Sequence, residues 1–118
     1  MAKQYDLEDR TLKFAREIRA FLKQLPRTQS NVEDCKQLIR SSGSIGANYI
    51  EANESLSKKD FLMRLRIAKK EAKESRYWLE LIDINSSELE AARQRYLGES
   101  TELMVILSSI ILKVESKV

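Results

Sequence analysis

The strongest fold signal lies in residues 61–82, which read FLMRLRIAKKEAKESRYWLELI. Apolar or small residues recur there at steps of three and four, the spacing that places side chains on one face of an α-helix. The members of this stripe are Phe61, Leu65, Ala68, Ala72, Ser75, Leu79 and Ile82. Ser57, followed by Asp60 three residues later, is a signal for a helix N-terminus. We expect a helix that starts after Ser57 and runs to about Asp83.

Three further segments have the same period. The first runs over residues 7–24 and stops at Pro26, which cannot continue a helix. The second begins at a possible capping box of Ser30 and Glu33 and extends to about residue 55, and the last covers residues 89–114 with an expected interruption at Gly98. Their stripes are Leu7, Thr11, Phe14, Ile18, Phe21 and Leu25; Cys35, Leu38, Ser42, Ile45, Tyr49 and Ala52; and Leu89, Ala92, Tyr96, Leu103, Leu107, Ile110 and Val114.

The composition agrees with an all-α protein. One proline and three glycines occur in 118 residues, few enough for long helices. Connections of a few residues cannot cross the length of a bundle, so consecutive helices should lie antiparallel. We expect one domain over residues 1–118, an up-and-down, left-handed four-helix bundle.

The sequence contains no targeting or membrane signal that we can recognise. The N-terminal residues MAKQYDLEDR lack the apolar stretch of a signal peptide, and the apolar run around residues 104–112 is interrupted by Ser108 and Ser109 and too short for a bilayer. The lone Cys35 lies on a helical apolar stripe, which favours a small buried side chain over a reactive thiol. We expect a bacterial cytoplasmic protein that does not enter membranes.

Residues that carry catalytic chemistry are scarce. Histidine is absent, which excludes the usual serine or cysteine nucleophile–histidine pairs and the Glu-x-x-His metal site of some bundles. The remaining catalytic option is a carboxylate group, with candidates Glu51, Glu54, Glu71 and Glu74, but solvated or ion-paired glutamates are the more ordinary interpretation. We therefore expect no enzyme, metal or cofactor.

Two glycines stand inside the second predicted helix, at positions 43 and 46. The run Ser41–Gly46 resembles a phosphate loop only superficially, because it lacks the Gly-Lys-Ser/Thr ending and a preceding strand. Each helical glycine costs about 1 kcal/mol relative to alanine. We expect them to allow close approach of another helix or a local bend, in preference to ligand contact.

The net charge of +3 is unevenly distributed. Residues 1–30 and residues 58–83 each carry +3, whereas residues 31–57 carry −2 and residues 84–118 carry −1. On the helix of residues 58–83, cations gather on one flank and the carboxylates Asp60, Glu71 and Glu74 on the other. An ordinary solvated face and a nucleic-acid surface both fit this pattern. The candidate nucleic-acid-binding residues are Arg16, Arg19, Lys23, Arg66, Lys69, Lys70, Lys73 and Arg76.

Tyr77, Trp78 and Leu81 point away from the stripe of their own helix. Either an oligomer interface covers them or a wide bundle core absorbs Trp78. Asn48 and Glu51 lie one helical turn apart, and we expect a hydrogen-bonding pair that fixes helix register, with a binding site as the alternative.

These residues resemble the bacterial four-helix-bundle proteins named for open reading frames in intervening sequences of 23S ribosomal RNA genes. The resemblance covers nearly the whole chain. It rests on Arg40-Ser41-Ser42-Gly43-Ser44-Ile45, Asn48, Tyr49 and Glu51, and then on Ser57, Asp60, Phe61, Leu62, Ile67, Ala68 and Glu74. The chain departs from the family where Ala52 replaces a frequent glycine and Lys70-Glu71 replaces a frequent Gly-Ser.

The resemblance implies a homopentameric ring. Similar barrels serve as accessory proteins of diversity-generating retroelements, where they bind nucleic acid and a reverse transcriptase. The expected partners are therefore further copies of the chain, together with RNA or DNA. A protein-interaction scaffold or accessory subunit without a nucleic-acid role is the alternative.

Overall fold

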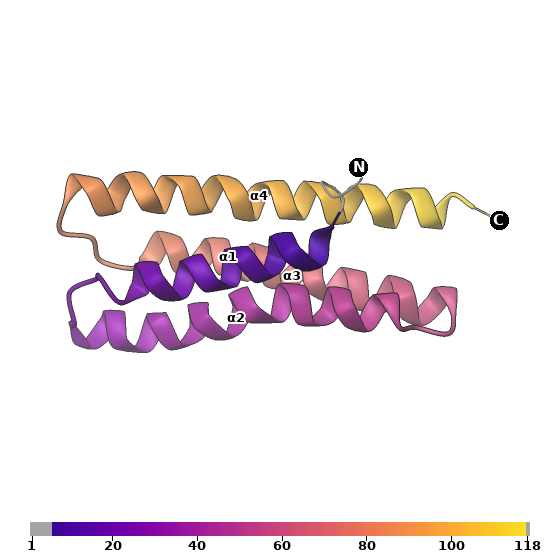
Figure 1. Ribbon diagram of the computed structural model, residues 1–118, viewed down its shortest axis with the longest axis horizontal. Coiled ribbons are helices and arrows are strands. Elements are labelled where there is room, and N and C mark those ends of the chain that lie inside the picture. The colour runs from indigo at the N-terminus through magenta and orange to yellow at the C-terminus, as the bar shows by residue number, and fades with distance from the viewer. Residues whose placement is uncertain (1–5, 118) are drawn as a thin grey trace.

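Four α-helices account for nearly all of residues 6–117, the part of the chain that the computed structural model describes. They are α1 (Leu7–Leu22), α2 (Gln29–Asn53), α3 (Lys58–Leu81) and α4 (Ser87–Glu115). The helices lie side by side, and the chain reverses direction at each connection (Figure 1). The shape is elongated, with extents of 51 × 29 × 19 Å. The predicted all-α, four-helix architecture is confirmed.

Each helix starts at a side chain that caps its free N–H groups. Asp6, Ser57 and Ser86 each accept a hydrogen bond from the backbone N–H three residues later, as does Thr28 at the start of α2. The expected N-cap at Ser57 is confirmed. The capping box at Ser30 is wrong, because α2 begins two residues earlier and Thr28 caps Asn31. The expected interruption at Gly98 is also wrong, since α4 is continuous.

The core follows the predicted stripes of α1 and α3 closely. Every stripe residue of α1 is buried, and α3 differs only at Phe61, which is half-buried. On α4, Leu103 and Leu107 are fully buried as expected, but Leu97, Ser100 and Ile111 complete its inner face. Residues 103–112 carry no charge, so polarity gives little indication of which side of α4 faces inward.

α2 and α3 approach each other through small polar side chains. The hydroxyls of Ser41 on α2 and Ser75 on α3 are fully buried and hydrogen-bonded to each other at 2.8 Å. α3 also packs against α4, and α2 against α1, whereas α1 and α4 touch only slightly. The helices are therefore arranged around the bundle in the order α1, α2, α3, α4, so that the α1–α2 edge lies opposite the α3–α4 edge.

Gly46 marks a close approach of α1 to α2. A Cβ atom at Gly46 would lie 2.5 Å from Oγ1 and 3.0 Å from Cβ of Thr11, which is buried and donates its hydroxyl to the carbonyl of Leu7. At Gly43, a Cβ would meet only the guanidinium of Arg19, at 3.6 Å. The expected packing role holds for Gly46 but not for Gly43.

Gly46→Ala should lower the free energy of unfolding by about 1–2 kcal/mol, because the clash with Thr11 outweighs the gain in helix propensity. Gly98→Ala is the matched control, since nothing lies within 4 Å of its Cβ position. We expect the control to stabilise the protein by about 0.5–1 kcal/mol. Urea unfolding of both variants checks the prediction, and a stabilising Gly46→Ala would contradict it.

Candidate nucleic-acid interface

A groove of about 530 Å³ between α3 and α4 brings together four of the predicted cations. Arg66, Lys69, Lys70 and Lys73 occupy steps of three and four along α3, so their side chains share one side of the helix. The α4 wall comprises Ser108, Ile111, Leu112 and Glu115. Glu115 is the one carboxylate among these lining residues.

The three lysines of this groove are unneutralised. Arg66 pairs with Glu115, and the more distant Arg76 donates to Oγ1 of Thr101 at 2.8 Å. By contrast, within residues 6–117 no hydrogen bond or ion pair engages Lys69, Lys70 or Lys73, and all three are exposed. Their positive charges therefore remain available to an anionic partner. We call Lys69, Lys70 and Lys73 the lysine triad.

The α1 cations lie elsewhere. Arg16 and Arg19 line a groove between α1 and α2, and Lys23 lines its neighbour toward the α1–α2 connection. This edge is opposite the α3–α4 edge. The eight predicted residues therefore form two separate surfaces. A helical pattern gives the faces of each helix but not the rotation of one helix relative to the next, which is why the sequence did not reveal the division.

The acidic flank of α3 packs against α2. Arg40 Nη2 donates to Glu71 at 3.2 Å and to Glu74 at 3.0 Å, and these contacts raise the pKa of Arg40, with the Glu71 hydrogen bond as the largest cause. Glu71 is buried. The ion-paired interpretation of Glu71 and Glu74 is confirmed. Because these carboxylates face α2, the lysine triad lies on the outward and α4-facing sides of α3.

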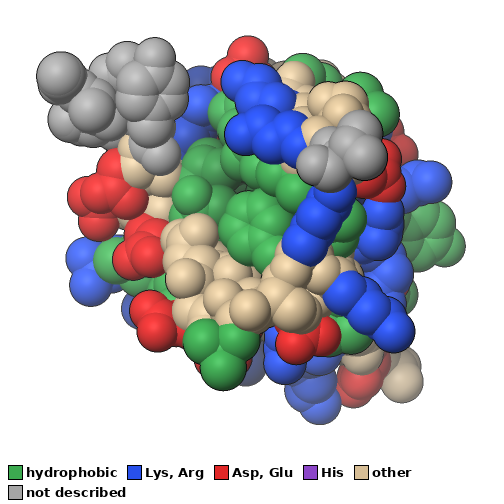
Figure 2. All heavy atoms as spheres, turned by 90° about the vertical axis from the view of Figure 1, so that its right-hand side faces the viewer, with side chains coloured by type: hydrophobic (Ala, Val, Ile, Leu, Met, Phe, Trp, Pro, Cys, Tyr) green, Lys and Arg blue, Asp and Glu red, His purple; other side chains and the backbone are tan. Residues whose placement is uncertain are grey.

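Charge is also unevenly spread at one end of the bundle. Figure 2 shows the end where α2 meets α3 and α4 terminates, with hydrophobic side chains in the centre. Lys and Arg predominate on one side of this view and Asp and Glu on the other. The modest net charge of +3 therefore understates the local charge that a ligand meets.

The predicted interface residues Tyr77, Trp78 and Leu81 differ in how far they are buried. Trp78 is half-buried and packs against the core, so the bundle itself absorbs much of its ring. Tyr77 and Leu81 are 58% and 46% exposed. The Tyr77 ring meets the Trp78 ring edge-on, with centroids 5.1 Å apart. The role of these three residues in an oligomer interface stays a prediction.

Asn48 contacts different partners from the one expected. Its Nδ2 donates to the carbonyl of Ser44 at 2.9 Å, and its Oδ1 accepts from Arg64 of α3 at 3.1 Å. Within the described chain no hydrogen bond joins it to Glu51, which is exposed. The expected pair is wrong, because the Glu51 side chain lies in solvent. Asn48 links α2 to α3 through Arg64 instead.

Metal-binding side chains do not cluster within residues 6–117. No group of three His, Cys, Asp or Glu side chains there could hold a metal ion. Cys35 is only half-buried, contrary to expectation, but its partial burial raises the pKa of the thiol, with a smaller contribution from Asp34. The thiol is therefore protonated at neutral pH and is not an activated nucleophile. In the same part of the chain, no helix is long and apolar enough to cross a bilayer.

The family assignment follows from comparison with known sequences. A sequence model of the 23S rRNA-intervening sequence proteins matches residues 3–109. The chain belongs to this family.

A solved structure supports this family fold. The chain is similar to a protein of unknown function from the S23 ribosomal protein family of Bacteroides thetaiotaomicron, with 39% identity and a TM-score of 0.76. The match covers 88% of this chain and 96% of that one. A search of curated proteins found no match.

The motif that carried the resemblance is mainly structural in this 23S rRNA-intervening sequence protein. Arg40 neutralises two α3 carboxylates, Ser41 bonds to Ser75, and Ile45 is fully buried. The two departures behave differently. Ala52 is buried, whereas Lys70 is exposed and adds to the lysine triad.

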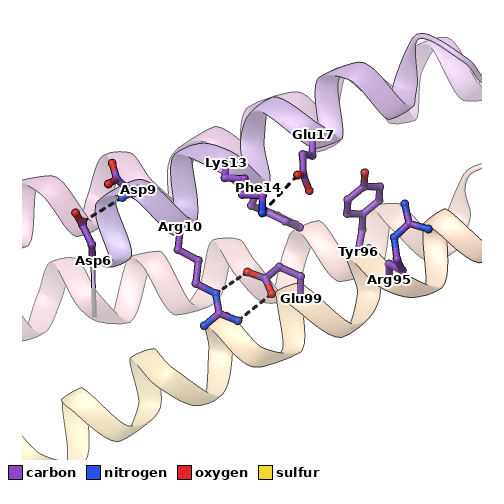
Figure 3. A pocket seen from close by; sticks show the side chains of 9 residues that line it. All are labelled: Asp6, Asp9, Arg10, Lys13, Phe14, Glu17, Arg95, Tyr96 and Glu99. Atoms are coloured by element: carbon purple, nitrogen blue, oxygen red, sulfur yellow. Dashed lines mark hydrogen bonds and ion pairs between the residues drawn. The ribbon is translucent and has the colours of Figure 1, made fainter. Parts of the chain in front are cut away.

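A further cleft, of about 580 Å³, opens where α1 and α4 make few contacts (Figure 3). Arg10 spans it with hydrogen bonds to Glu99 at 2.7 and 2.9 Å, which raise the pKa of Arg10. The rings of Phe14 and Tyr96, which meet edge to face with centroids 6.4 Å apart, form part of its wall. No pattern in the sequence predicted this cleft. Carboxylates and cations both line it, so a polyanion is attracted less strongly here than at the lysine triad.

Proposed function

We propose that this 23S rRNA-intervening sequence protein is a non-enzymatic, oligomeric protein of the bacterial cytoplasm that binds RNA or DNA through phosphate groups. The observation that carries the proposal is the lysine triad, three adjacent exposed cations without protein partners in one groove. Lysine ammonium groups that replace condensed counterions on a nucleic acid release those ions, and this release drives binding. Arg66 and Arg76 lie beside the triad on α3, but each is ion-paired with a carboxylate, Glu115 and Glu80 respectively, so the lysines carry the free positive charge.

The assembly that we propose is the homopentameric ring of left-handed bundles implied by the family resemblance. An apolar stripe on the α1–α2 edge supports a contact between copies. It consists of Leu12, Val32, Ile39 and Ile50, which are 37–49% exposed. Self-association would remove this stripe from water. Five copies would also present five lysine triads to one nucleic-acid chain, and the multiple contacts would strengthen binding.

A protein-interaction scaffold is the second candidate function. The observation in its favour is the same α1–α2 edge, where Arg16, Arg19 and Lys23 lie beside the apolar stripe. Such a surface fits an amphipathic segment with an acidic flank on a partner protein, for example a reverse transcriptase. In that role the chain would need no direct contact with nucleic acid.

Light scattering followed by nucleic-acid binding on the same sample tests these proposals. We expect a mass near five times that of the 13.7 kDa chain. We also expect binding to structured RNA or DNA that weakens steeply between about 50 and 200 mM salt. A monomer would exclude the ring. A pentamer that binds neither RNA nor DNA would favour the protein-interaction scaffold.

A further inference from the structure

The outward side of α3 combines the lysine triad with an exposed aromatic ring. Lys70, Lys73 and Tyr77 are spaced by three and four residues, so they lie along one face of the helix. Tyr77 follows Lys73 by one turn, a rise of about 6 Å. Its side chain is the most exposed among the aromatic residues of this helix.

The ring of Tyr77 is supported by its neighbour Trp78. Its ring contacts Trp78 edge-on at a 77° interplanar angle, and Trp78 is itself packed against the core. Such support limits the rotamers of the tyrosine before a ligand arrives, so less conformational entropy is lost on binding. Neither a hydrogen bond nor an ion pair within residues 6–117 engages the Tyr77 hydroxyl. The ring is therefore held in place but remains open to a ligand.

We propose that Tyr77 stacks on an unpaired base whose neighbouring phosphates contact the lysine triad, so that this surface selects single-stranded over double-stranded nucleic acid. The inference rests on the proposed function and specifies its ligand. A duplex keeps its bases stacked on one another, whereas a single strand can turn a base onto a protein ring. Aromatic platforms beside a positively charged path are the arrangement that binds single strands without sequence preference.

A second copy of the chain is a poorer occupant of this surface. Lys70 and Lys73 flank the approach to Tyr77, and burying them against another copy would require carboxylates to neutralise them. The apolar stripe of the α1–α2 edge carries four large exposed aliphatic side chains and is better suited to self-contact. We therefore assign Tyr77 to the ligand and leave the stripe to assembly.

Fluorescence anisotropy with two probes of equal phosphate number tests the inference: a single-stranded uridine oligomer and a duplex. The variants are Tyr77→Ala and Tyr77→Phe. Met63→Ala is the control, because it removes another exposed large apolar side chain of α3, about four turns before Tyr77. We expect Tyr77→Ala to weaken single-strand binding roughly 5- to 100-fold and to leave duplex binding unchanged. Tyr77→Phe and Met63→Ala should bind as the parent does.

The salt dependence separates stacking from charge. Because a stacked base releases no counterions, Tyr77→Ala should keep the parent slope of affinity against salt. Equal losses for both probes, no loss at all, or a smaller oligomer mass in Tyr77→Ala would overturn the inference. If the parent binds neither probe, the proposed function fails as well. If it binds both and Tyr77→Ala changes nothing, only the stacking inference fails.

Discussion

Asn31→Ala should lower the free energy of unfolding by about 3 kcal/mol, the largest single-residue stability effect that we predict. Asn31 is buried, with 2% exposure, where the two connections at one end of the bundle meet. Its Nδ2 donates to the carbonyls of Pro26 and Asp83, both at 3.0 Å, and its Oδ1 accepts the N–H of Asp83 at 2.8 Å. Alanine would leave these backbone groups without their partner.

Urea denaturation of Asn31→Ala and its neighbour Ser30→Ala measures the effect. Ser30 is exposed, and its hydroxyl makes only two long contacts, with Asp83 Oδ2 at 3.3 Å and Thr28 Oγ1 at 3.4 Å, so we expect a change below about 0.5 kcal/mol. Asn31→Asp keeps the acceptor but loses both amide donors, and it should be about as destabilising as alanine. Similar stabilities for Asn31→Ala and Ser30→Ala would show that the amide does not link the two connections.

The largest functional effect should come from reversing the lysine triad. Lys69→Glu/Lys73→Glu removes two phosphate contacts and adds two repulsive charges, so we expect nucleic-acid affinity to fall roughly 100-fold at low salt. The slope of log affinity against log salt should decrease by about 2. Neither lysine has a protein partner within residues 6–117, so the fold should be unaffected.

Two further double variants test whether the loss of nucleic-acid affinity is specific to the lysine triad. Lys13→Glu/Arg95→Glu causes the same change in net charge but in the α1–α4 cleft, and it should affect binding much less. Arg16→Glu/Lys23→Glu reverses charge on the α1–α2 edge. If this last variant alone abolished binding, the nucleic acid would lie on the opposite edge from the one we propose. If triad reversal instead broke the oligomer, the triad would be part of an assembly contact.

Much of the fold could be predicted because its signals act within a helical turn. Ser57 caps α3 as predicted, and the inner faces of α1 and α3 follow their apolar spacing. The start of α2 was misplaced because Ser30 and Thr28 are both plausible caps. Capping by Thr28 places Asn31 in the first turn of α2, where its side chain reaches the nearby carbonyl of Pro26 and the carbonyl of Asp83, which is remote in sequence. A contact remote in sequence thus favours one of two equivalent local signals.

The candidate site was predicted less completely. The sequence identified each cation of α3, and the structure places four of them in one groove with α4. It could not separate them from Arg16 and Arg19, because the position of α1 relative to α3 depends on how each packs against α2 and α4. Nor could it show that Trp78 is partly absorbed by the core while Tyr77 remains exposed, although the two residues are adjacent.

The sequence by itself determines four features: the number of helices, most helix ends, the charged flanks of α3 and the absence of histidine chemistry. These features follow from periodicity, capping and composition, which are local properties. Three other features depend on tertiary packing: the division of the cations between two edges, the need for glycine at position 46 but not at 43, and the burial of Asn31. Each depends on atoms brought together from separate helices or connections, as with Asn31 and Asp83, 52 residues apart. The rotation and spacing of packed helices set those distances, and no single helix encodes them.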